Sequence, residues 1–317
     1  MAEKRRVILD MDPGVDDALA IIYAVKSGRL DIAGITAVAG NVEVQKTSTN
    51  ALKVLELLDA PGWPVAVGSD KPLKRALVPE TWVHGENGLG DVQLPEPRRT
   101  FVPQHAVDFI IETVRKNPGE LTLVPTGPLT NVARAFLKDP QLPKLIKEII
   151  LMGGAASTHG NSTAVAEFNI WADPDAAKVV FRSGADITMV GLDVTMRAYI
   201  TPEDVQELRR IRDNRVTAFV EVLTRQMFGL TAKIFGKSMV ALHDPLAVGM
   251  AIDSSYCTVE RMPVEVETES QLTLGQTVCD RRPWRDLDTT PRPYAKVCVA
   301  VDRERFVEDF LATLAHQ

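Results

Sequence analysis

The sequence predicts an α/β fold with an open, mainly parallel sheet flanked by helices and an antiparallel edge hairpin near the C-terminus. Three observations predict it. Short runs rich in β-branched residues recur over the first 190 residues, and longer segments with the apolar spacing of helices separate them. After about residue 260 the apolar residues alternate with polar ones instead. Strands that alternate with helices form βαβ units with parallel strands, whereas a period of two indicates an antiparallel hairpin.

Six apolar runs have the length of buried strands. They are residues 7–9, 32–38, 65–67, 121–124, 149–152 and 187–190. Five segments with helical spacing lie between them, at residues 17–25, 47–58, 105–116, 130–138 and 173–182. The last of these opens with Asp173 and Pro174, a capping residue followed by proline at the first helical position. This order of elements predicts a Rossmann-like arrangement.

The C-terminal part departs from the strand and helix alternation. We expect a helix after Thr201, because Pro202 and two acidic residues follow this capping residue. Residues 264–267 and 272–274 alternate around a polar break and predict the edge hairpin. A strand over 297–301 and a terminal helix over 306–315 complete the pattern. No repeat or linker interrupts the chain, so we expect one domain over residues 1–317.

Composition excludes several classes of partner. The chain has 36 Lys and Arg against 42 Asp and Glu, a net charge of −6. Nucleic-acid binding needs clustered cations, so we expect no nucleic-acid partner. No run approaches the roughly 18 apolar residues of a membrane span, and no apolar run of secretory length follows the N-terminus. Three cysteines without CxxC spacing are typical of a reducing compartment, so we expect a cytoplasmic protein that does not bind membranes.

The strongest chemical signal is a group of four acidic residues near the N-terminus. Asp10, Asp12, Asp16 and Asp17 lie between the first predicted strand and an apolar helix. Carboxylates packed at one strand end repel one another, so a cation is expected among them. Oxygen ligands without a nearby cysteine favour Ca²⁺ or Mg²⁺ over Zn²⁺. The loop is not an EF-hand, since Val15 stands where that loop requires glycine.

Further polar residues follow the later strands or lie in long connecting segments. The carboxyl ends of parallel strands form the ligand crevice of open α/β sheets, so these residues should converge there. They are Asn41, Thr126, Asn161, Glu167 and Asn169, and Met152 ends the strand that precedes the last three. We expect residues 68–103 and 153–172 to form walls of the site, because loops of this length in compact domains are usually functional.

Two histidines accompany these residues. His243 and Asp244 open another apolar helix, and His84 lies within the long segment that contains Trp82. A histidine beside a carboxylate can be part of a metal site, a general acid or a helix cap. The residues alone leave these roles open.

Several motifs in order make the sequence similar to the inosine-uridine preferring nucleoside hydrolases. They are DMDPGVDDALA at 10–20, AVAGN at 37–41, HGENGLG at 84–90, LVPTGPLTN at 123–131, LMGG at 151–154, VAEFNIWADPDAA at 165–177, MVGLDVT at 189–195 and HDP at 243–245. The first block is specific by itself. Together the motifs extend the resemblance over nearly the whole chain.

The resemblance implies Ca²⁺-dependent hydrolysis of the N-glycosidic bond of ribonucleosides, through an oxocarbenium-like transition state. The implied Ca²⁺ ligands are Asp12, Asp17, the backbone carbonyl of Thr126 and Asp244. Asp12 would also be the general base on the metal-bound water, and Asp10 would orient this group. The residues implied to hold the ribose are Asp16, Asn41, Met152, Asn161, Glu167 and Asn169.

The resemblance also implies a base-binding side. His84 and His243 would face the base or its leaving nitrogen, and Trp82, Phe168 and Phe235 would supply apolar or stacking surface. At the position of Phe235, some similar family members that accept purines have tyrosine. The preferred base therefore stays open. We expect a homodimer or homotetramer with a ribonucleoside substrate and no organic cofactor.

Two other functions have to be weighed against hydrolysis of nucleosides. Asp10 and Asp12 after a strand also resemble the acid pair of haloacid-dehalogenase-type phosphatases, but Pro13 follows where those enzymes usually have threonine or valine. A non-catalytic nucleoside-binding protein should have lost its base or its acid, yet Asp12 and His243 are both present. Inosine turnover with release of ribose separates the three functions, since a phosphatase would release phosphate and a binding protein would release nothing.

Overall fold

The computed structural model describes residues 4–316, so residues 1–3 and 317 of the expected domain lie outside the described residues. The described residues form a large sheet with the strand order β10-β9-β11-β6-β5-β4-β1-β2-β3. Its strands are β1 (Arg5–Met11), β2 (Leu30–Ala37), β3 (Val65–Val67), β4 (Leu121–Pro125), β5 (Glu148–Met152), β6 (Ile187–Val190), β9 (Cys257–Val266), β10 (Thr277–Cys279) and β11 (Tyr294–Val301). β7 (Tyr199–Ile200) and β8 (Val240–Ala241) form a separate antiparallel pair.

Strand directions confirm the predicted fold class. Along the sheet, from β3 at one edge through β2, β1, β4, β5 and β6 to β11, all neighbouring strands pair in parallel. The pairings of β9 with β11 and with β10 are antiparallel, so the hairpin lies at one edge. The six strands predicted before residue 200 are all present, with ends extended by a few residues at most.

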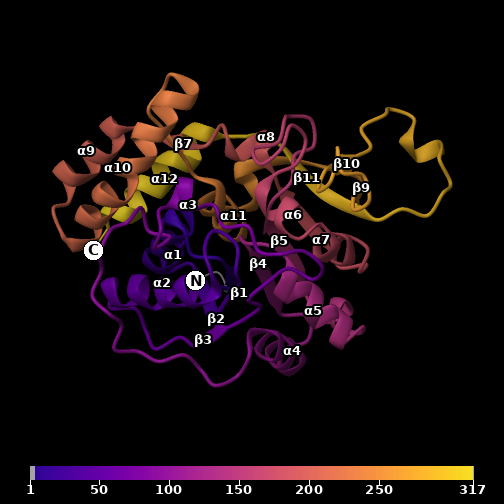
Figure 1. Cartoon of the computed structure of the whole chain (residues 1–317), viewed down its shortest axis with the longest axis horizontal. Helices are drawn as coiled ribbons and strands as arrows, with labels where there is room; N and C mark the ends of the chain where they lie inside the picture. Colours follow the sequence, from indigo (N-terminus) through magenta and orange to yellow (C-terminus); the bar gives the residue numbers. More distant parts are fainter. Residues whose placement is uncertain (1–3, 317) are drawn as a thin grey trace.

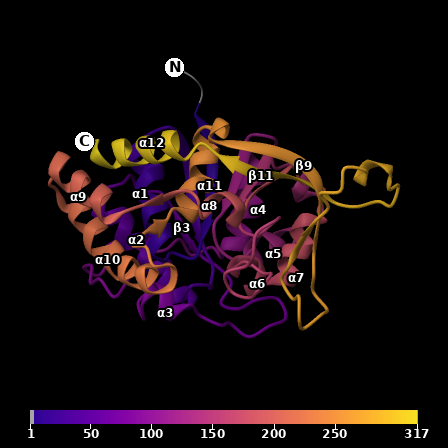
Figure 2. The same cartoon turned by 90° about the horizontal axis from the view of Figure 1, so that it is seen from above.

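Helices cover both faces of the sheet (Figure 1 and Figure 2). They are α1 (Val15–Ser27), α2 (Val44–Leu57), α3 (Thr81–His84), α4 (Ala106–Lys116), α5 (Thr130–Lys138), α6 (Phe168–Ala172), α7 (Pro174–Phe181), α8 (Leu192–Thr195), α9 (Pro202–Ile211), α10 (Arg215–Phe235), α11 (His243–Ile252) and α12 (Arg303–Ala315). Short 3₁₀ turns occur at Leu142–Lys144, Ser254–Tyr256 and Arg285–Leu287. Among the described residues, no helix has both the length and the apolar character needed to cross a membrane.

The central position of β1 in the sheet explains why its sequence is continuously apolar and does not alternate with polar residues. Val7 and Leu9 belong to the apolar cluster beneath α1, α2, α11 and α12. Ile8 belongs to the cluster on the other face, beneath α4, α5 and α7. Because both faces of the sheet are covered, successive side chains of a central strand are all buried.

The capping signals in the sequence act as expected. The Asp173 carboxylate accepts a hydrogen bond from the backbone N–H of Ala176 at 3.0 Å and begins α7. Thr201 and Asp204 form a reciprocal capping box at the start of α9, in which each side chain accepts from the other residue's backbone N–H. These caps satisfy N–H groups that the first helical turn leaves free.

The second strand of the edge hairpin is the one element that the sequence places wrongly. Residues 272–274 form a turn, and β10 begins at Thr277. The Thr277 hydroxyl accepts from the N–H of Ala155 at 2.9 Å and donates to the carbonyl of the same residue at 2.8 Å. Leu272 is 86% exposed. A contact with a distant loop therefore sets the position of the strand, which a local alternation of residue types cannot reveal.

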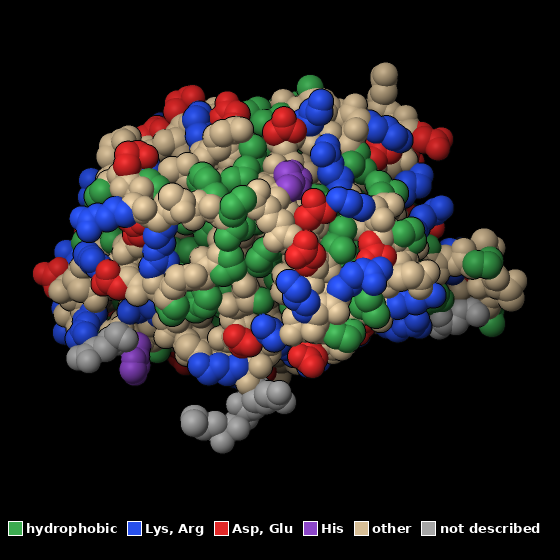
Figure 3. Space-filling view, turned by 90° about the horizontal axis from the view of Figure 1, so that it is seen from below, with side chains coloured by type: hydrophobic (Ala, Val, Ile, Leu, Met, Phe, Trp, Pro, Cys, Tyr) green, Lys and Arg blue, Asp and Glu red, His purple; other side chains and the backbone are tan. Residues whose placement is uncertain are grey.

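Charged residues do not collect into a basic surface on the face shown in Figure 3. Acidic and basic side chains are mixed there, and apolar side chains gather in a band between them. The segment between β10 and β11 projects from the body of the molecule (Figure 2). The face in Figure 3 lacks the continuous basic patch that nucleic acids require.

We predict that Phe306→Ala lowers the free energy of unfolding by about 3–5 kcal/mol, because it leaves a cavity in a packed core. Phe306 is fully buried, and its ring lies 5.4 Å from the ring of Tyr256 and 6.1 Å from that of Tyr23, measured between centroids. Chemical denaturation measures the loss. The control is Leu272→Ala, which should change stability by no more than about 0.5 kcal/mol. Equal losses in both variants would contradict the packing described for α12.

Candidate active site

A cavity of about 340 Å³ opens at the carboxyl ends of the parallel strands. This size is within the usual range for small-molecule sites. Its walls come from the strand ends, from the segments around α3 and α6, and from α10 and the start of α11. The residues predicted from the sequence that line it are Asp16, Asn41, Trp82, His84, Thr126, Met152, Asn161, Glu167, Phe168, Asn169, Phe235, His243 and Asp244.

Three carboxylates meet at the floor of this cavity. Asp16, Asp17 and Asp244 each offer an oxygen within 4.8 Å of the others. Burial, followed by repulsion from Asp17, raises the pKa of Asp16 to about 7. Burial and the neighbouring aspartates also raise the pKa of Asp244 well above its ordinary value. Since all the donors are oxygen atoms and their charges repel, the cluster suits a hard divalent cation.

Asp12 lies behind the lining residues and is fully buried. Its Oδ2 atom accepts from the backbone N–H of Asn41 at 2.7 Å. Its Oδ1 atom has no hydrogen-bond partner among the described residues. A Cβ atom at Gly127 would lie 2.6 Å from this oxygen, and one at Gly40 would collide with Oδ2. The two glycines therefore let the backbone approach a carboxylate whose free oxygen needs a partner.

Asp17 is held by three different parts of the chain. Thr126 donates its hydroxyl to Oδ1 at 2.9 Å, while Gly14 N–H and the Asn41 amide donate to Oδ2 at 2.9 and 3.1 Å. The carbonyl oxygen of Thr126 accepts from the Asn169 amide at 2.6 Å and retains a second lone pair. These contacts fix the orientation of the cluster before any ligand binds.

Asp10 does not line the cavity. It is fully buried beneath the cluster, where Oδ1 accepts from Thr36 at 2.6 Å and from Asn131 at 2.8 Å. Its backbone carbonyl accepts from the N–H of Thr126 at 2.8 Å. Burial raises the pKa of Asp10 to about 6. Its contacts are thus with β2, with α5 and with the end of β4.

A second group of polar residues lies across the cavity from the cluster. The Glu167 carboxylate caps α6 and accepts from the backbone N–H groups of Asn169, Gly154 and Ile170. Burial nevertheless raises the pKa of Glu167 to about 7. Asn161 accepts from the backbone N–H of Phe168 at 2.9 Å through its Oδ1 atom, so its amide N–H groups stay free for a ligand.

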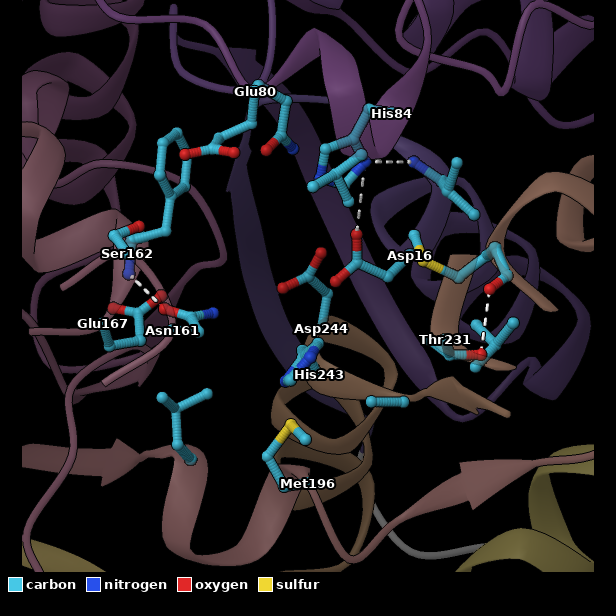
Figure 4. A pocket seen from close by; sticks show the side chains of 18 of the residues that line it. Asp16, Glu80, His84, Asn161, Ser162, Glu167, Met196, Thr231, His243 and Asp244 are labelled. Carbon is cyan, nitrogen blue, oxygen red and sulfur yellow. Dashed lines mark hydrogen bonds and ion pairs between the residues drawn. The ribbon is translucent and has the colours of Figure 1, made fainter. Parts of the chain in front are cut away.

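The two histidines lie on opposite sides of Asp16 and Asp244 (Figure 4). His84 accepts from the backbone N–H of Val15 at 3.1 Å through Nδ1, and burial lowers the pKa of His84 to about 3. The Nδ1 atom of His243 lies 2.8 Å from the hydroxyl oxygen of Thr195, and burial lowers the pKa of His243 to about 4. Both rings are therefore neutral at pH 7.

The aromatic residues expected at the base lie at the cavity, with different exposure. Phe168 is buried, whereas Trp82 is 59% exposed and Phe235 is 50% exposed. Phe235 ends α10 and lines the cavity. It is not a core residue, so it is available to contact a ligand.

Sequence reasoning missed several lining residues. They are Val15, Glu80, Val83, His159, Gly160, Ser162, Leu192, Met196, Met227, Leu230, Thr231, Ile234, Met239, Val240 and Ala241. The lining residues on α10 have the three- and four-residue spacing of one helix face. The sequence around a methionine does not show whether its side chain faces a cavity or the core. Glu80 lies within the segment 68–103 that the sequence predicts as a wall, but no pattern singles it out.

Comparison with known proteins agrees with this geometry. The family model for inosine-uridine preferring nucleoside hydrolase matches residues 7–308. The chain belongs to this family. The matches confirm the resemblance found in the sequence and favour neither the phosphatase nor the non-catalytic alternative.

The proteins to which this chain is similar carry names that state different base preferences. The chain is 40% identical over 311 residues to the inosine-uridine preferring nucleoside hydrolase of Crithidia fasciculata, with 95% of each chain covered. It is 42% identical over 314 residues to the pyrimidine-specific ribonucleoside hydrolase RihA of Shewanella sp. (strain MR-7), covering 98% of this chain and 96% of the relative. A solved purine-preferring ribonucleoside hydrolase from Gardnerella vaginalis has a TM-score of 0.91 and 37% identity, with 98% of each chain covered. Family membership therefore leaves the base preference open.

We predict that Gly127→Ala lowers kcat/KM for a nucleoside substrate by about 10², because the added methyl group displaces Asp12 and small misplacements in a site are costly. Steady-state kinetics measures the loss, and circular dichroism checks the fold. The control is Gly62→Ala, since a Cβ atom there meets nothing within 4 Å. Full activity of Gly127→Ala would show that the position of Asp12 is unimportant.

Proposed function

We propose that this enzyme hydrolyses the N-glycosidic bond of ribonucleosides to free base and ribose with the aid of Ca²⁺. The observation that carries the proposal is the buried carboxylate cluster beneath a cavity, beside an Asp12 oxygen that has no partner among the described residues. The cavity also offers the amide and carboxylate groups of Asn161, Glu167 and Asn169, which suit the hydroxyl groups of a sugar.

Asp12, Asp17, Asp244 and the carbonyl of Thr126 are the proposed Ca²⁺ ligands. A cation held by these residues would lower the pKa of a water molecule and would help to position it for attack on the sugar. The three carboxylates whose oxygens lie within 4.8 Å of one another include Asp16 and do not include Asp12. We assign Asp16 to the sugar because it lines the cavity beside His84, whereas the free oxygen of Asp12 lies behind the lining residues.

The chain's own residues supply most of the proposed mechanism. Positive charge develops on the sugar as the C–N bond breaks, and the surrounding carboxylates stabilise it. Asp12 accepts a proton from the attacking water through its free oxygen. Asp10 beneath it holds the strand ends in register. General base catalysis of this kind contributes roughly 10² to 10⁴ in rate.

The remaining lining groups position the ribose. Asp16, Asn41, Met152, Asn161, Glu167 and Asn169 are the residues that we propose to hold it. Their polar atoms are fixed by hydrogen bonds to the backbone, as in the three N–H groups on Glu167. A 2′-deoxyribose would leave one buried group without its partner, so the site should discriminate against it.

The two neutral histidines are the candidates for protonating the leaving base. In the tautomer that carries its proton on Nε2, His243 accepts from the Thr195 hydroxyl through Nδ1, and Nε2–H can donate to the base. Nδ1 of His84 is occupied by the Val15 N–H in the same way. Trp82, Phe168 and Phe235 would contact the base. The single domain, the cytoplasmic location and the homodimeric or homotetrameric assembly stay predictions from the sequence.

We expect the enzyme to convert inosine to hypoxanthine and ribose, and EGTA to abolish this activity and lower the melting temperature together. Without the cation, the carboxylates repel one another, and a ligand that binds only the folded state stabilises it. A reducing-sugar assay and thermal denaturation measure both effects, and added Ca²⁺ should restore both. Full activity in protein shown by elemental analysis to be metal-free would contradict the role of Ca²⁺. Absence of ribose release with every common ribonucleoside would contradict the function itself.

We predict that His243→Ala lowers kcat on inosine by roughly 10² to 10⁴ and lowers kcat on p-nitrophenyl riboside far less. A purine anion is a poor leaving group and needs a proton, whereas p-nitrophenolate leaves readily. His84→Ala is the matched variant and should show the weaker dependence on the leaving group. Equal losses on both substrates would indicate damage to the neighbouring Asp244 instead.

A further inference from the structure

Glu80 lies in the cavity, and the mechanism above gives it no role. It is the residue immediately before α3, and its backbone is held on both sides. The N–H of Glu80 donates to the carbonyl of Asn41 at 3.0 Å. The carbonyl of Glu80 accepts from Val83 at 2.9 Å and from His84 at 3.0 Å. Figure 4 shows the side chain at the cavity on the same side as His84. Its position is therefore fixed by the same turn that fixes the histidine.

The carboxylate of Glu80 has an unused acceptor. Its Oε2 atom is buried and has no hydrogen-bond partner among the described residues. Burial raises the pKa of Glu80, and the Trp82 side chain favours the charged form. No Lys or Arg is among the described residues that line the cavity. A buried acceptor without a donor costs free energy, and a ligand can recover it by donating a hydrogen bond.

The surroundings of Glu80 indicate which part of a nucleoside supplies that donor. Trp82, Val83 and His84 line the cavity from the same turn, and His84 faces the leaving base in the proposed function, on which this step rests. Three of the groups proposed for the sugar, Asn161, Glu167 and Asn169, come from the segment around α6, whereas Asp16 lies beside His84 and Asn41 bonds the backbone of Glu80. On α10, the Thr231 hydroxyl is already bonded to the backbone of Met239, donating at 2.7 Å and accepting at 3.0 Å. Glu80 is thus a group on this side whose buried acceptor has no partner among the described residues.

We propose that Glu80 is a specificity-determining residue that accepts a hydrogen bond from a ring N–H of the base. Hypoxanthine, guanine and uracil carry such an N–H on their pairing edge. Adenine and cytosine have a bare ring nitrogen at the equivalent position, whose lone pair faces a carboxylate unfavourably. The cavity should therefore favour nucleosides of lactam bases, whether purine or pyrimidine, over those of amino bases.

The test compares inosine with 1-methylinosine and purine riboside, which both lack the ring N–H. Glu80→Ala should lower kcat/KM on inosine at least about tenfold, the usual contribution of a hydrogen bond to a charged group. It should leave kcat/KM on purine riboside unchanged or raise it, because that base has no donor to lose and its bare ring nitrogen no longer faces a carboxylate. Purine riboside is smaller than inosine, so this comparison removes the steric effect of the methyl group in 1-methylinosine.

Two further variants complete the design. Glu80→Gln preserves the size of the side chain and a neutral acceptor, so its loss on inosine should be smaller than that of Glu80→Ala. Glu86→Ala is the control, since Glu86 is an exposed acid of the same segment outside the cavity. It should leave kcat/KM on all three substrates unchanged.

Several results would overturn the assignment of Glu80. Equal losses on inosine and purine riboside would show that Glu80 only positions the turn that carries His84. Weaker binding of free ribose by Glu80→Ala would place the carboxylate at the sugar. Unchanged kinetics on inosine would show that its acceptor stays solvated. If the folded wild-type protein cleaves no nucleoside, the proposed function fails and this assignment fails with it. Cleavage without the expected discrimination overturns the assignment of Glu80 alone.

Discussion

Repulsion among buried carboxylates is the constraint on which the rest of the site depends. Asp16, Asp17 and Asp244 approach one another in a setting that has lost most of its solvent, and Asp12 lies buried beside them. Burial raises the pKa of every member, and repulsion adds to this effect at Asp12, Asp16 and Asp244, so a partner of positive charge stabilises the ionised cluster. The cation that we propose would satisfy the cluster, and the charge that develops on the sugar would benefit from the same field.

The scaffold around the cluster is arranged so that this repulsion is tolerated. Hydrogen bonds from Asn41 and Thr126 orient Asp17, and Gly40 and Gly127 allow the backbone to pass close to Asp12. These residues follow different strands, and the parallel sheet brings them to one edge. A rigid, preorganised arrangement of this kind costs little reorganisation during reaction, which is the main requirement for electrostatic catalysis.

The side of the cavity that we propose for the base offers mainly apolar contacts instead of charges. Its wall is mostly apolar and includes Met196, Met227 and Met239, whose flexible side chains adapt to different shapes. Selectivity on such a surface comes from the few polar groups at its margin, of which Glu80 has the free acceptor. The relatives' names give different bases, and we attribute such differences to the margin of the cavity rather than to the residues proposed for the sugar and the cation.

The sequence by itself determined the fold class and the order of the elements before residue 200, and it indicated the acidic residues that follow β1. It could do so because buried parallel strands are continuously apolar, and because carboxylates crowded at one strand end repel one another and stand out in the sequence. Only the tertiary structure decided the position of β10, which Thr277 fixes through a bond to a distant loop. It also decided that Glu80 and Met227 of α10 face the cavity. Contacts between segments far apart in the chain set these features, and local patterns of residue type carry no record of them.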